Sequence, residues 1–365
     1  MTKFVALIGL WITTLCAADT SASSIQAQHT THQKAKIQVA LILDTSGSMD
    51  GLLEQAKSQL WKMVNELATS KKNGLTPSIE LALYEYGKST IVATEGYIKQ
   101  LVPLSSDLDL VSEQLFALKT NGGDEYCGWA IKDATKELKW SDSNDDLKII
   151  IIAGNEIFTQ GSVDYRKACQ SAISQGIVVN TIYCGDCTEG IRYLWKDAAD
   201  LADGQYMCIN QNDQVAHIET PFDAEIGQLN KVLNETYIAY GEVGESRKQR
   251  QQSQDTNAGN YGASNVAERA VSKSKKATYN NASWDMVDAL EDNESLLEEI
   301  EISALPKVMK SMDLEERKKF VAKKAKERAD IQQKIQEVAE QRKAFISKKR
   351  KETSSNKSNT LDEVM

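Results

Sequence analysis

The sequence predicts a doubly wound α/β domain, with a mostly parallel sheet flanked by helices, followed by a linker and an α-helical tail. From residue 36 to 241, short β-rich runs alternate with amphipathic stretches of helical length. A polar motif follows the first of these runs directly. After residue 244 the composition changes to Gln, Ser, Asn, Lys and Ala, and the last long segment contains neither Gly nor Pro. Each of these observations is developed below in chain order.

The first 22 residues predict a secretory signal peptide. Lys3 precedes an apolar run of about 15 residues, and small residues follow it. This run is shorter than the ~18 to 20 residues that a membrane-spanning helix needs, and no later run without charges is as long. We therefore expect an exported protein, periplasmic or extracellular, with no transmembrane span.

Four apolar runs are typical of strands in a parallel sheet that is buried on both faces. They are residues 37–43, 79–86, 147–152 and 177–183. Five stretches carry apolar residues at three- and four-residue spacing, which predicts covering helices. They are residues 52–67, 108–118, 127–138, 164–174 and 189–201. In a fold of this kind, ligands bind at the carboxyl ends of the strands.

A polar motif stands at the first of these carboxyl ends. Asp44, Ser46 and Ser48 place one carboxylate and two hydroxyls on a turn directly after the run VALIL. Oxygen ligands of this type suit a hard cation, most naturally Mg²⁺, with Mn²⁺ as the alternative. Gly47 between the two serines permits a tight turn. The motif therefore predicts a site for one divalent ion.

The motif and the order of strands and helices around it resemble the von Willebrand factor type A (VWA) domain, over residues 36–241. The metal-ion-dependent adhesion site of that family begins with Asp-x-Ser-x-Ser at this turn. The resemblance implies that Ser46 and Ser48 bind the ion directly and that Asp44 acts through water. It also implies that a carboxylate of a protein partner completes the coordination.

Two further loops of that family match less closely. Where the family has Thr after a Gly-Gly pair, this chain has Asp124, with Thr120 a few residues earlier as a less certain ligand. A solvated loop acid is the alternative for Asp124. Where the family has Thr-Asp-Gly, this chain has Ala-Gly-Asn155-Glu156, which resembles a subgroup of exported bacterial proteins. Either Asn155 or Glu156 fills the vacant position, or water does, and we expect a weaker or differently tuned site.

The cysteines offer a rival function. Cys184 and Cys187 follow a strand and precede a helix, as the redox pair of a thioredoxin-like protein does. The alternatives are a local disulfide, or a disulfide from one of the two to Cys169 or Cys208. Without Cys16 of the signal peptide the number of cysteines is odd, so no complete disulfide framework follows.

The region after the α/β domain divides into three parts. Residues 245–277 contain little to bury and predict a polar linker. Residues 284–352 predict a helical or coiled-coil tail, in which Asp313 and Glu316 form a capping box at the start of the long helix. Residues 353–365 are expected to be a disordered C-terminus.

The charge of the tail bears on how it packs. Residues 311–352 contain 14 Lys and Arg against 8 Asp and Glu, whereas residues 284–301 contain eight acidic residues and no basic ones. The long helix carries a narrow apolar stripe, which must be covered to gain from burial. We expect an intramolecular hairpin that turns near residues 305–312, with self-association as a coiled coil as the alternative.

Composition excludes some classes of function. The chain has 365 residues, of which 41% are apolar, and 43 basic against 52 acidic residues give a net charge of −9, which argues against a nucleic-acid partner. No motif of nucleophilic catalysis or phosphate binding occurs, so we expect a protein that is not an enzyme. The prediction is an exported, metal-dependent protein-binding module. The alternatives are an assembly protein that acts through its tail with a degenerate metal site, and a thiol-disulfide redox protein.

Overall fold

The computed structural model describes residues 35–72, 74–213 and 217–353. The predicted signal peptide at residues 1–22 lies outside the described residues. So does the predicted disordered C-terminus at residues 353–365, except for residue 353, which ends a helix.

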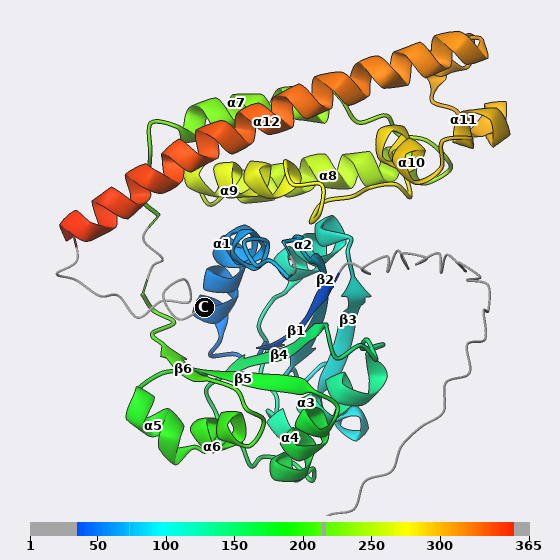
Figure 1. Ribbon diagram of the computed structural model, residues 1–365. Helices are drawn as coiled ribbons and strands as arrows, with labels where there is room; N and C mark the ends of the chain where they lie inside the picture. The colour runs from blue at the N-terminus through cyan, green and yellow to red at the C-terminus, as the bar shows by residue number, and fades with distance from the viewer. Residues whose placement is uncertain (1–34, 73, 214–216, 354–365) are drawn as a thin grey trace, which may run out of the picture. The chain divides into compact units, whose positions relative to one another are not determined.

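A six-stranded sheet forms the centre of the α/β part, in the order β3-β2-β1-β4-β5-β6 (Figure 1). The strands are β1 (Lys36–Asp44), β2 (Ser78–Tyr86), β3 (Ile98–Ser105), β4 (Leu147–Gly154), β5 (Ile177–Cys184) and β6 (Tyr206–Ile209). All neighbours are parallel except β3, which pairs antiparallel with β2. The predicted doubly wound, mostly parallel sheet is confirmed, with β3 and β6 as additional edge strands.

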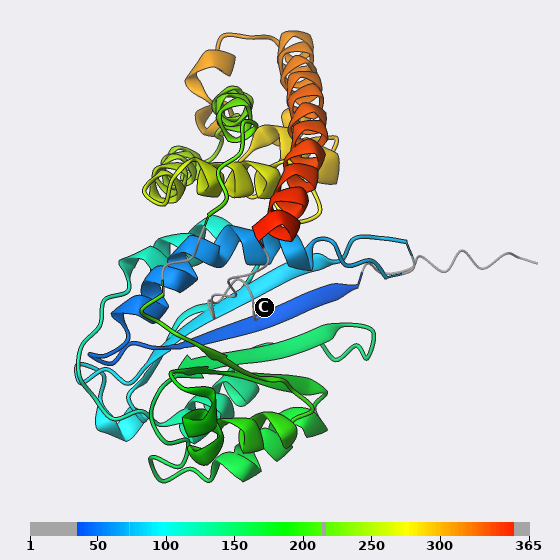
Figure 2. The ribbon, with the colours of Figure 1, turned by 90° about the vertical axis from the view of Figure 1, so that its left-hand side faces the viewer.

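Helices cover both faces of the sheet because alternate side chains of each strand point to opposite sides. Val39 and Leu41 of β1 pack with α1 (Asp50–Leu67) and α2 (Leu108–Ala117), whereas Ala40 and Ile42 pack on the opposite face. That face is covered by α3 (Cys127–Glu137), α4 (Tyr165–Ser174) and α6 (Trp195–Asp200). Figure 2 shows the two sets of helices on either side of the sheet. The single helix expected at residues 189–201 is divided into α5 (Cys187–Arg192) and α6 by Leu194, whose φ is 70°.

A layer of helices follows the sheet in sequence and packs on the outer side of α1 and α2 (Figure 1). Its members are α7 (Asp223–Asn234), α8 (Gly244–Gly259), α9 (Ala263–Lys273), α10 (Met286–Asp292), α11 (Leu296–Glu299) and α12 (Leu314–Thr353). Short 3-10 turns are η1 (Ala93–Glu95), η2 (Ile302–Ala304) and η3 (Lys307–Met309). The predicted α/β domain reached residue 241, but α7 packs with α9 and α12, so the α/β part ends at β6.

The predicted polar linker at residues 245–277 is corrected by the structure, because α8 and α9 occupy it. Arg269 of α9 is fully buried, and its guanidinium pairs with Asp109 of α2 at 2.9 Å and with Asp255 of α8. The same guanidinium lies over the ring of Trp61 in α1, 4.5 Å from its centroid. Part of the polar composition of this segment therefore reflects buried ion pairs.

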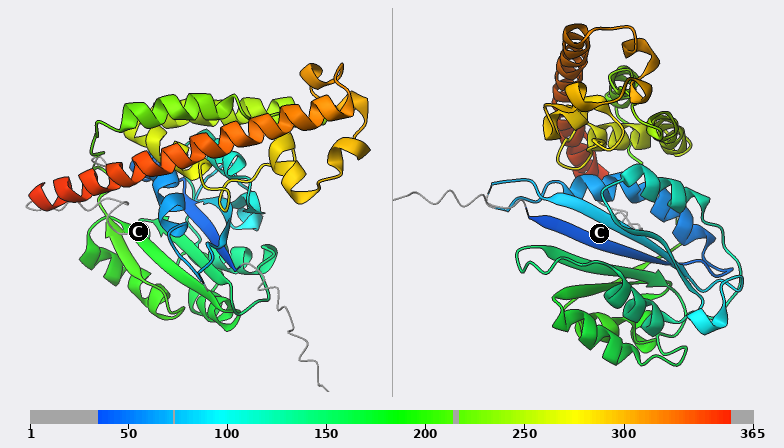
Figure 3. Two further views of the ribbon diagram at one scale, coloured as in Figure 1. Left: turned by 45° about the horizontal axis from the view of Figure 1, so that its top comes forward. Right: turned by 90° about the vertical axis from the view of Figure 1, so that its right-hand side faces the viewer.

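The long helix α12 begins with the predicted capping box. The Asp313 amide donates to Glu316 Oε2 at 3.0 Å, and the Glu316 amide donates to Asp313 Oδ1 at 2.8 Å. Two views in Figure 3 place α12 along α7, and it contacts α9, α10 and α11 as well. Val321, Ile335 and Val338 of its stripe are buried by these helices. The stripe is thus covered within one chain, by more helices than the acidic segment that the hairpin prediction named.

Candidate metal centre at the ends of β1 and β4

The strand order places the candidate site at the point where the direction of winding reverses. The strand β1 lies between β2 and β4, and the helices that follow β1 and β4 pack on opposite faces of the sheet. In doubly wound folds, ligands bind in the crevice outside the carboxyl ends of the strands at this point. Asp44 ends β1 and Gly154 ends β4, so the predicted residues stand at that crevice.

The β1 loop gathers three of the predicted ligands. Asp44 is fully buried, and its Oδ1 accepts a hydrogen bond from the Ser46 amide at 2.7 Å. The hydroxyl oxygens of Ser46 and Ser48 are 3.4 Å apart. Ser46 is buried and Ser48 is exposed, so the pair of hydroxyls connects the interior to solvent. From β4, Asn155 Nδ2 donates to Ser48 Oγ at 3.1 Å, which joins the third loop to the first.

Glu125 also belongs to the site, and the sequence analysis missed it. It is 5% exposed, and its carboxyl group lies close enough to Asp44 and Ser46 for both to affect its pKa. Gly87 makes room for this contact: its φ is +79°, and a Cβ there would lie 2.8 Å from Asp44 Oδ1 and 2.9 Å from Glu125 Cγ. The sequence signal was present as two adjacent acids in Gly-Gly-Asp-Glu, of which only one turns inward.

Burial and mutual repulsion keep one proton on this carboxyl pair. Burial raises the pKa of Asp44 to about 6. Burial, reinforced by the Asp44 charge, raises the pKa of Glu125 to about 9. At neutral pH Glu125 is therefore protonated, whereas Asp44 is mostly ionised. The two groups form a buried unit with one negative charge.

Two of the predicted candidates lie outside this unit. Asp124 is exposed, and its Oδ2 accepts a hydrogen bond from the Tyr126 hydroxyl at 3.3 Å. Thr120 Oγ1 donates to Asp50 Oδ1 at 2.5 Å, at the start of α1. Within the described part of the chain, neither side chain forms a hydrogen bond with Asp44. The second loop thus reaches the site through Glu125.

Glu156 lies at the margin of the site. Its side chain is exposed, and its charge contributes to the raised pKa values of Asp44 and Glu125. Gln160 bridges the two loops, since its Oε1 accepts from the Glu125 amide at 3.1 Å and its Nε2 donates to Glu156 Oε2 at 3.4 Å. Glu156 is therefore close enough to act electrostatically but is held by a neighbour on its own loop.

The donor atoms fit a hard divalent cation. Asp44 Oδ2, Glu125 Oε2 and Asn155 Oδ1 are shielded from solvent and have no hydrogen-bond partner among the described residues. Unsatisfied oxygens of this kind are costly unless an ion or water completes them. No group of three or more His, Cys, Asp or Glu side chains suited to a metal occurs in residues 35–353 as described. The serine hydroxyls and the Asn155 amide would therefore have to supply part of the coordination.

The cysteine pairing overturns the predicted redox pair. Cys187 is bonded to Cys208, with 5.3 Å between their Cα atoms, whereas Cys184 is a free thiol. Cys184 ends β5 with its side chain in the core, and burial raises its pKa well above the usual value. A thiol of this kind is a poor nucleophile. Of the alternatives, the disulfide to Cys208 is the one observed.

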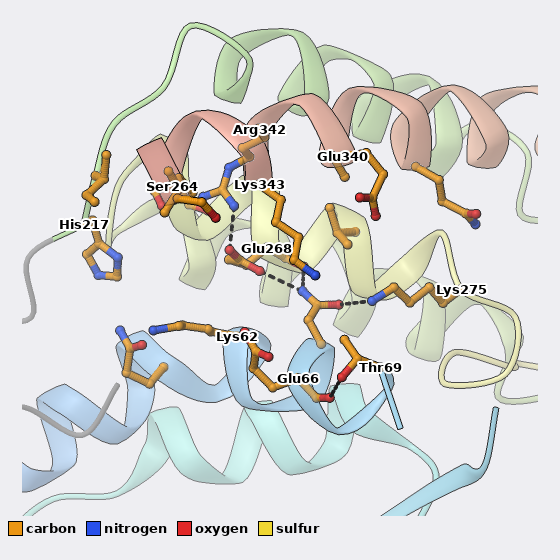
Figure 4. Close-up of a pocket in the computed structure, with 18 of the residues that line it drawn as sticks. Lys62, Glu66, Thr69, His217, Ser264, Glu268, Lys275, Glu340, Arg342 and Lys343 are labelled. Atoms are coloured by element: carbon orange, nitrogen blue, oxygen red, sulfur yellow. Dashed lines mark hydrogen bonds and ion pairs between the residues drawn. The ribbon is translucent and has the colours of Figure 1, made fainter. Parts of the chain in front are cut away.

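A cavity of about 550 Å³ lies elsewhere, between α1, α9 and α12 (Figure 4). None of the residues that line it belongs to the site loops. Its charges compensate one another: Arg342 pairs with Glu268 at 2.6 Å, and Asn65 donates to the other Glu268 oxygen at 2.9 Å. This cavity is therefore distinct from the candidate metal centre.

One family model matches part of this chain, and several solved structures are similar to it. Residues 38–193 match the family model of the von Willebrand factor type A domain. The conserved hypothetical protein BatB from Bacteroides thetaiotaomicron is similar in structure, with 15% identity, 60% of this chain and 99% of that chain covered, and a TM-score of 0.36. An aerotolerance-related membrane protein from Bacteroides fragilis has 18% identity, coverage of 48% and 93%, and a TM-score of 0.32. The pilus adhesin SpaC from Lactobacillus rhamnosus GG has 12% identity, coverage of 48% and 28%, and a TM-score of 0.35. No curated protein matches this chain in sequence.

The match to the family model and the strand order together confirm the predicted VWA-like fold for the α/β part. Within the part of the chain that the structure describes, no helix combines the length and apolar character needed to cross a membrane.

Proposed function

We propose that the α/β part is a cation-dependent protein-binding module in an exported protein that is not an enzyme. The observation that carries the proposal is the buried Asp44–Glu125 carboxyl pair beside two serine hydroxyls, of which Ser48 faces solvent. A buried acid pair whose oxygens lack partners is a costly feature, and the match to the type A family model offers a reason for it.

Two kinds of contact would hold an ion: direct ligands and a residue that acts through water. The hydroxyls of Ser46 and Ser48 and the carboxylate of Glu125 would bind it directly, after Glu125 loses its proton. Asp44 would hold the Ser46 amide and act through water. When bound, Mg²⁺ or Mn²⁺ supplies a positively charged site with an open coordination position for an oxygen ligand. A carboxylate of a protein partner is the ligand that we propose for that position.

The third loop tunes this site. Asn155 stands where the type A family has an aspartate, and it contributes an oxygen without a charge. An ion with one fewer carboxylate is held less tightly by the protein but attracts an external carboxylate more strongly. The Asn155-Glu156 variant resembles that of exported bacterial proteins, and it supports binding of an acidic partner.

Export rests on separate observations. The disulfide between Cys187 and Cys208 is typical of proteins in oxidising compartments. The sequence pattern of residues 1–22 is that of a signal peptide. Together they favour a periplasmic or extracellular location. Assembly through the helical layer is the alternative function, with the metal site as a degenerate turn.

Calorimetry with Mg²⁺ and with Mn²⁺ tests the metal site. The wild type should bind one ion. Ser46→Ala and Glu125→Gln should each lower the affinity at least about tenfold, because the first removes a ligand oxygen and the second removes a negative charge from the ion. Asp124→Asn is the matched control, since it makes the same chemical change on the neighbouring, exposed acid. Circular dichroism checks that each variant remains folded.

The outcomes discriminate between the functions. If neither ion produces heat or a thermal shift with the wild type, the degenerate-site alternative replaces the proposal. If Asp124→Asn weakens binding as strongly as Glu125→Gln, Asp124 is a ligand, as the sequence analysis predicted. A polypeptide that binds equally with and without the ion would exclude the cation-dependent mechanism.

A further inference from the structure

The cavity between α1, α9 and α12 contains a buried polar atom that the fold leaves unsatisfied. Gln59 of α1 lines this cavity and is 4% exposed. Its Nε2 atom donates to Ser58 Oγ at 3.3 Å, but its Oε1 atom has no hydrogen-bond partner among the described residues. A buried carbonyl oxygen without a donor costs free energy. This part of the cavity therefore favours a ligand that carries an N–H or O–H group.

A lysine of the same cavity is also incompletely paired. Lys275 of α9 is half-buried, and its ammonium group donates to Asn65 Oδ1 at 3.2 Å but forms no ion pair in the part of the chain that the structure describes. Burial lowers the pKa of this ammonium group. The nearby carboxylate of Glu268 is already paired with Arg342. A carboxylate supplied by a ligand would stabilise the charged form of Lys275.

Three further charged side chains lie near Lys275. Glu66, Lys343 and Glu340 line the cavity, and the charge of each affects the pKa of Lys275. Figure 4 shows α1 and α12 on opposite sides of the cavity, with Glu66 on the first helix and Glu340 and Lys343 on the second. None of these three forms an ion pair within residues 35–353 as described. Two acids and two lysines without ion-pair partners therefore gather in one part of the cavity.

The balance of these four charges indicates the class of ligand. Two acids and two bases attract a ligand that carries both an ammonium and a carboxylate group more strongly than they attract a simple anion or a simple cation. In a free α-amino acid the two charged groups are attached to one carbon atom. The terminal charges of a dipeptide are farther apart, because its two Cα atoms are about 3.8 Å from each other. Since all four side chains lie near one another, a free amino acid fits them better than a peptide.

The rest of the cavity has room for the side chain of the ligand. Its volume of about 550 Å³ lies in the range of pockets that bind small molecules, roughly 300–1,000 Å³. Gln59 precedes Glu66 by two turns of α1, which is about 10 Å at 1.5 Å per residue. Val271, Ala339 and Ile346 supply apolar lining. A long side chain that ends in a donor would therefore extend from the four charges toward the unpaired oxygen of Gln59.

We propose that this cavity binds a free α-amino acid with a long side chain that ends in an N–H donor. Lys275 and Lys343 bind its carboxylate, Glu66 and Glu340 bind its ammonium group, and Gln59 accepts a hydrogen bond from its side chain. The inference is independent of the proposed function, because no lining residue belongs to the candidate metal centre. The ligand would contact α1 of the α/β part together with α9 and α12 of the helical layer.

Titration of the full chain with L-arginine and with L-glutamine, followed by NMR, tests the inference. At least one of the two should bind. Its Nα-acetyl derivative lacks the ammonium charge and its amide lacks the carboxylate charge, so each should bind at least about tenfold more weakly. L-norleucine has no donor on its side chain and should bind more weakly to the wild type, whereas Gln59→Met should remove this difference.

A matched pair of variants locates the binding site. Lys343→Gln should lower the affinity for the amino acid at least about fivefold, because it removes a charge that binds the carboxylate. Lys334→Gln is the control, since Lys334 is exposed on the same helix and does not line the cavity. Its affinity should equal that of the wild type.

Three results would overturn the inference. If neither amino acid binds at millimolar concentration, the cavity has no ligand of this class. If the acetylated derivative binds as tightly as its parent, Glu66 and Glu340 do not recognise an ammonium group. If Lys334→Gln weakens binding as much as Lys343→Gln, the amino acid binds outside the cavity.

Discussion

Replacing Arg269 with methionine should lower the free energy of unfolding by about 3–5 kcal/mol. Arg269 is fully buried between α9, α8 and the α1–α2 face of the α/β part. Its guanidinium pairs with Asp109 and Asp255 and donates to the Gln251 carbonyl at 2.8 Å. Methionine has a similar length but no charge, so two buried carboxylates would lose their common cation.

The magnitude follows from what the variant leaves behind. Asp255 keeps Lys273 at 3.1 Å, and Asp109 keeps the hydroxyl of Tyr279, so neither carboxylate is left without a partner. Because these contacts remain, the loss of stability should be smaller than the sum of the contributions of the two ion pairs of Arg269. The lost contact with Trp61 adds about 0.5–2 kcal/mol. We therefore expect a value near the middle of the range.

Urea denaturation of the full chain, followed by circular dichroism and tryptophan fluorescence, measures the change. Arg166→Met is the matched control, because Arg166 also pairs with an acid, Asp197 at 3.1 Å, and lies over a ring, Tyr165 at 4.9 Å. Its side chain is 51% exposed, so this pair should contribute only about 0–1 kcal/mol. If the two variants differ by less than 1 kcal/mol, the buried network does not stabilise the protein as argued.

Three other predictions concern the site, the disulfide and the long helix. Because Glu125 has a pKa of about 9 and must lose its proton to bind an ion, the affinity for Mg²⁺ should rise with pH below 9. Calorimetry in buffers of different ionisation enthalpy should detect the released proton. Binding heats that do not depend on the buffer would contradict this prediction. Changing Cys187 and Cys208 together to Ser should lower the free energy of unfolding by about 2–4 kcal/mol in urea titrations, because the disulfide closes a loop with a sequence separation of 21. Reductant should lower the free energy of unfolding of the wild type by the same amount. Asp313→Ala should lower the free energy of unfolding by about 1 kcal/mol, because the helix loses its N-terminal cap. Asp330→Ala, at an exposed position in the middle of the same helix, is the control and should leave the stability unchanged. Equal shifts of the melting temperature in the two variants would show that the cap does not stabilise the protein.

The strands that the sequence predicted share one property. Residues 37–43, 147–152 and 177–183 are nearly continuous in apolar residues because helices cover both faces of the central strands. The edge strands β3 and β6 were not predicted. In β3 the pattern is broken by exposed side chains and by Pro103, since one side of the strand faces solvent.

The residues of the candidate metal centre also include some that the sequence predicts and some that it does not. Asp44, Ser46 and Ser48 could be predicted because they are consecutive on one turn whose position is set by the strand before it. The choice between Asp124 and Glu125 could not, because it depends on the direction in which the second loop enters the site. That direction is set by Gly87 and Gln160, which lie 38 and 35 residues from Glu125 in sequence.

The sequence by itself determined the α/β class, the β1 turn and the start of the long helix, because each depends on side chains close together in the chain. Tertiary structure decided the fate of residues 245–277, which are too polar to indicate burial. Arg269 and Lys273 are buried beside opposite charges: Asp255 lies in the preceding helix α8, whereas Asp109 lies 160 residues from Arg269, in α2. The composition of a segment indicates how unfavourable it is to remove its charges from water, but the opposite charges that offset this cost come together only when the chain folds.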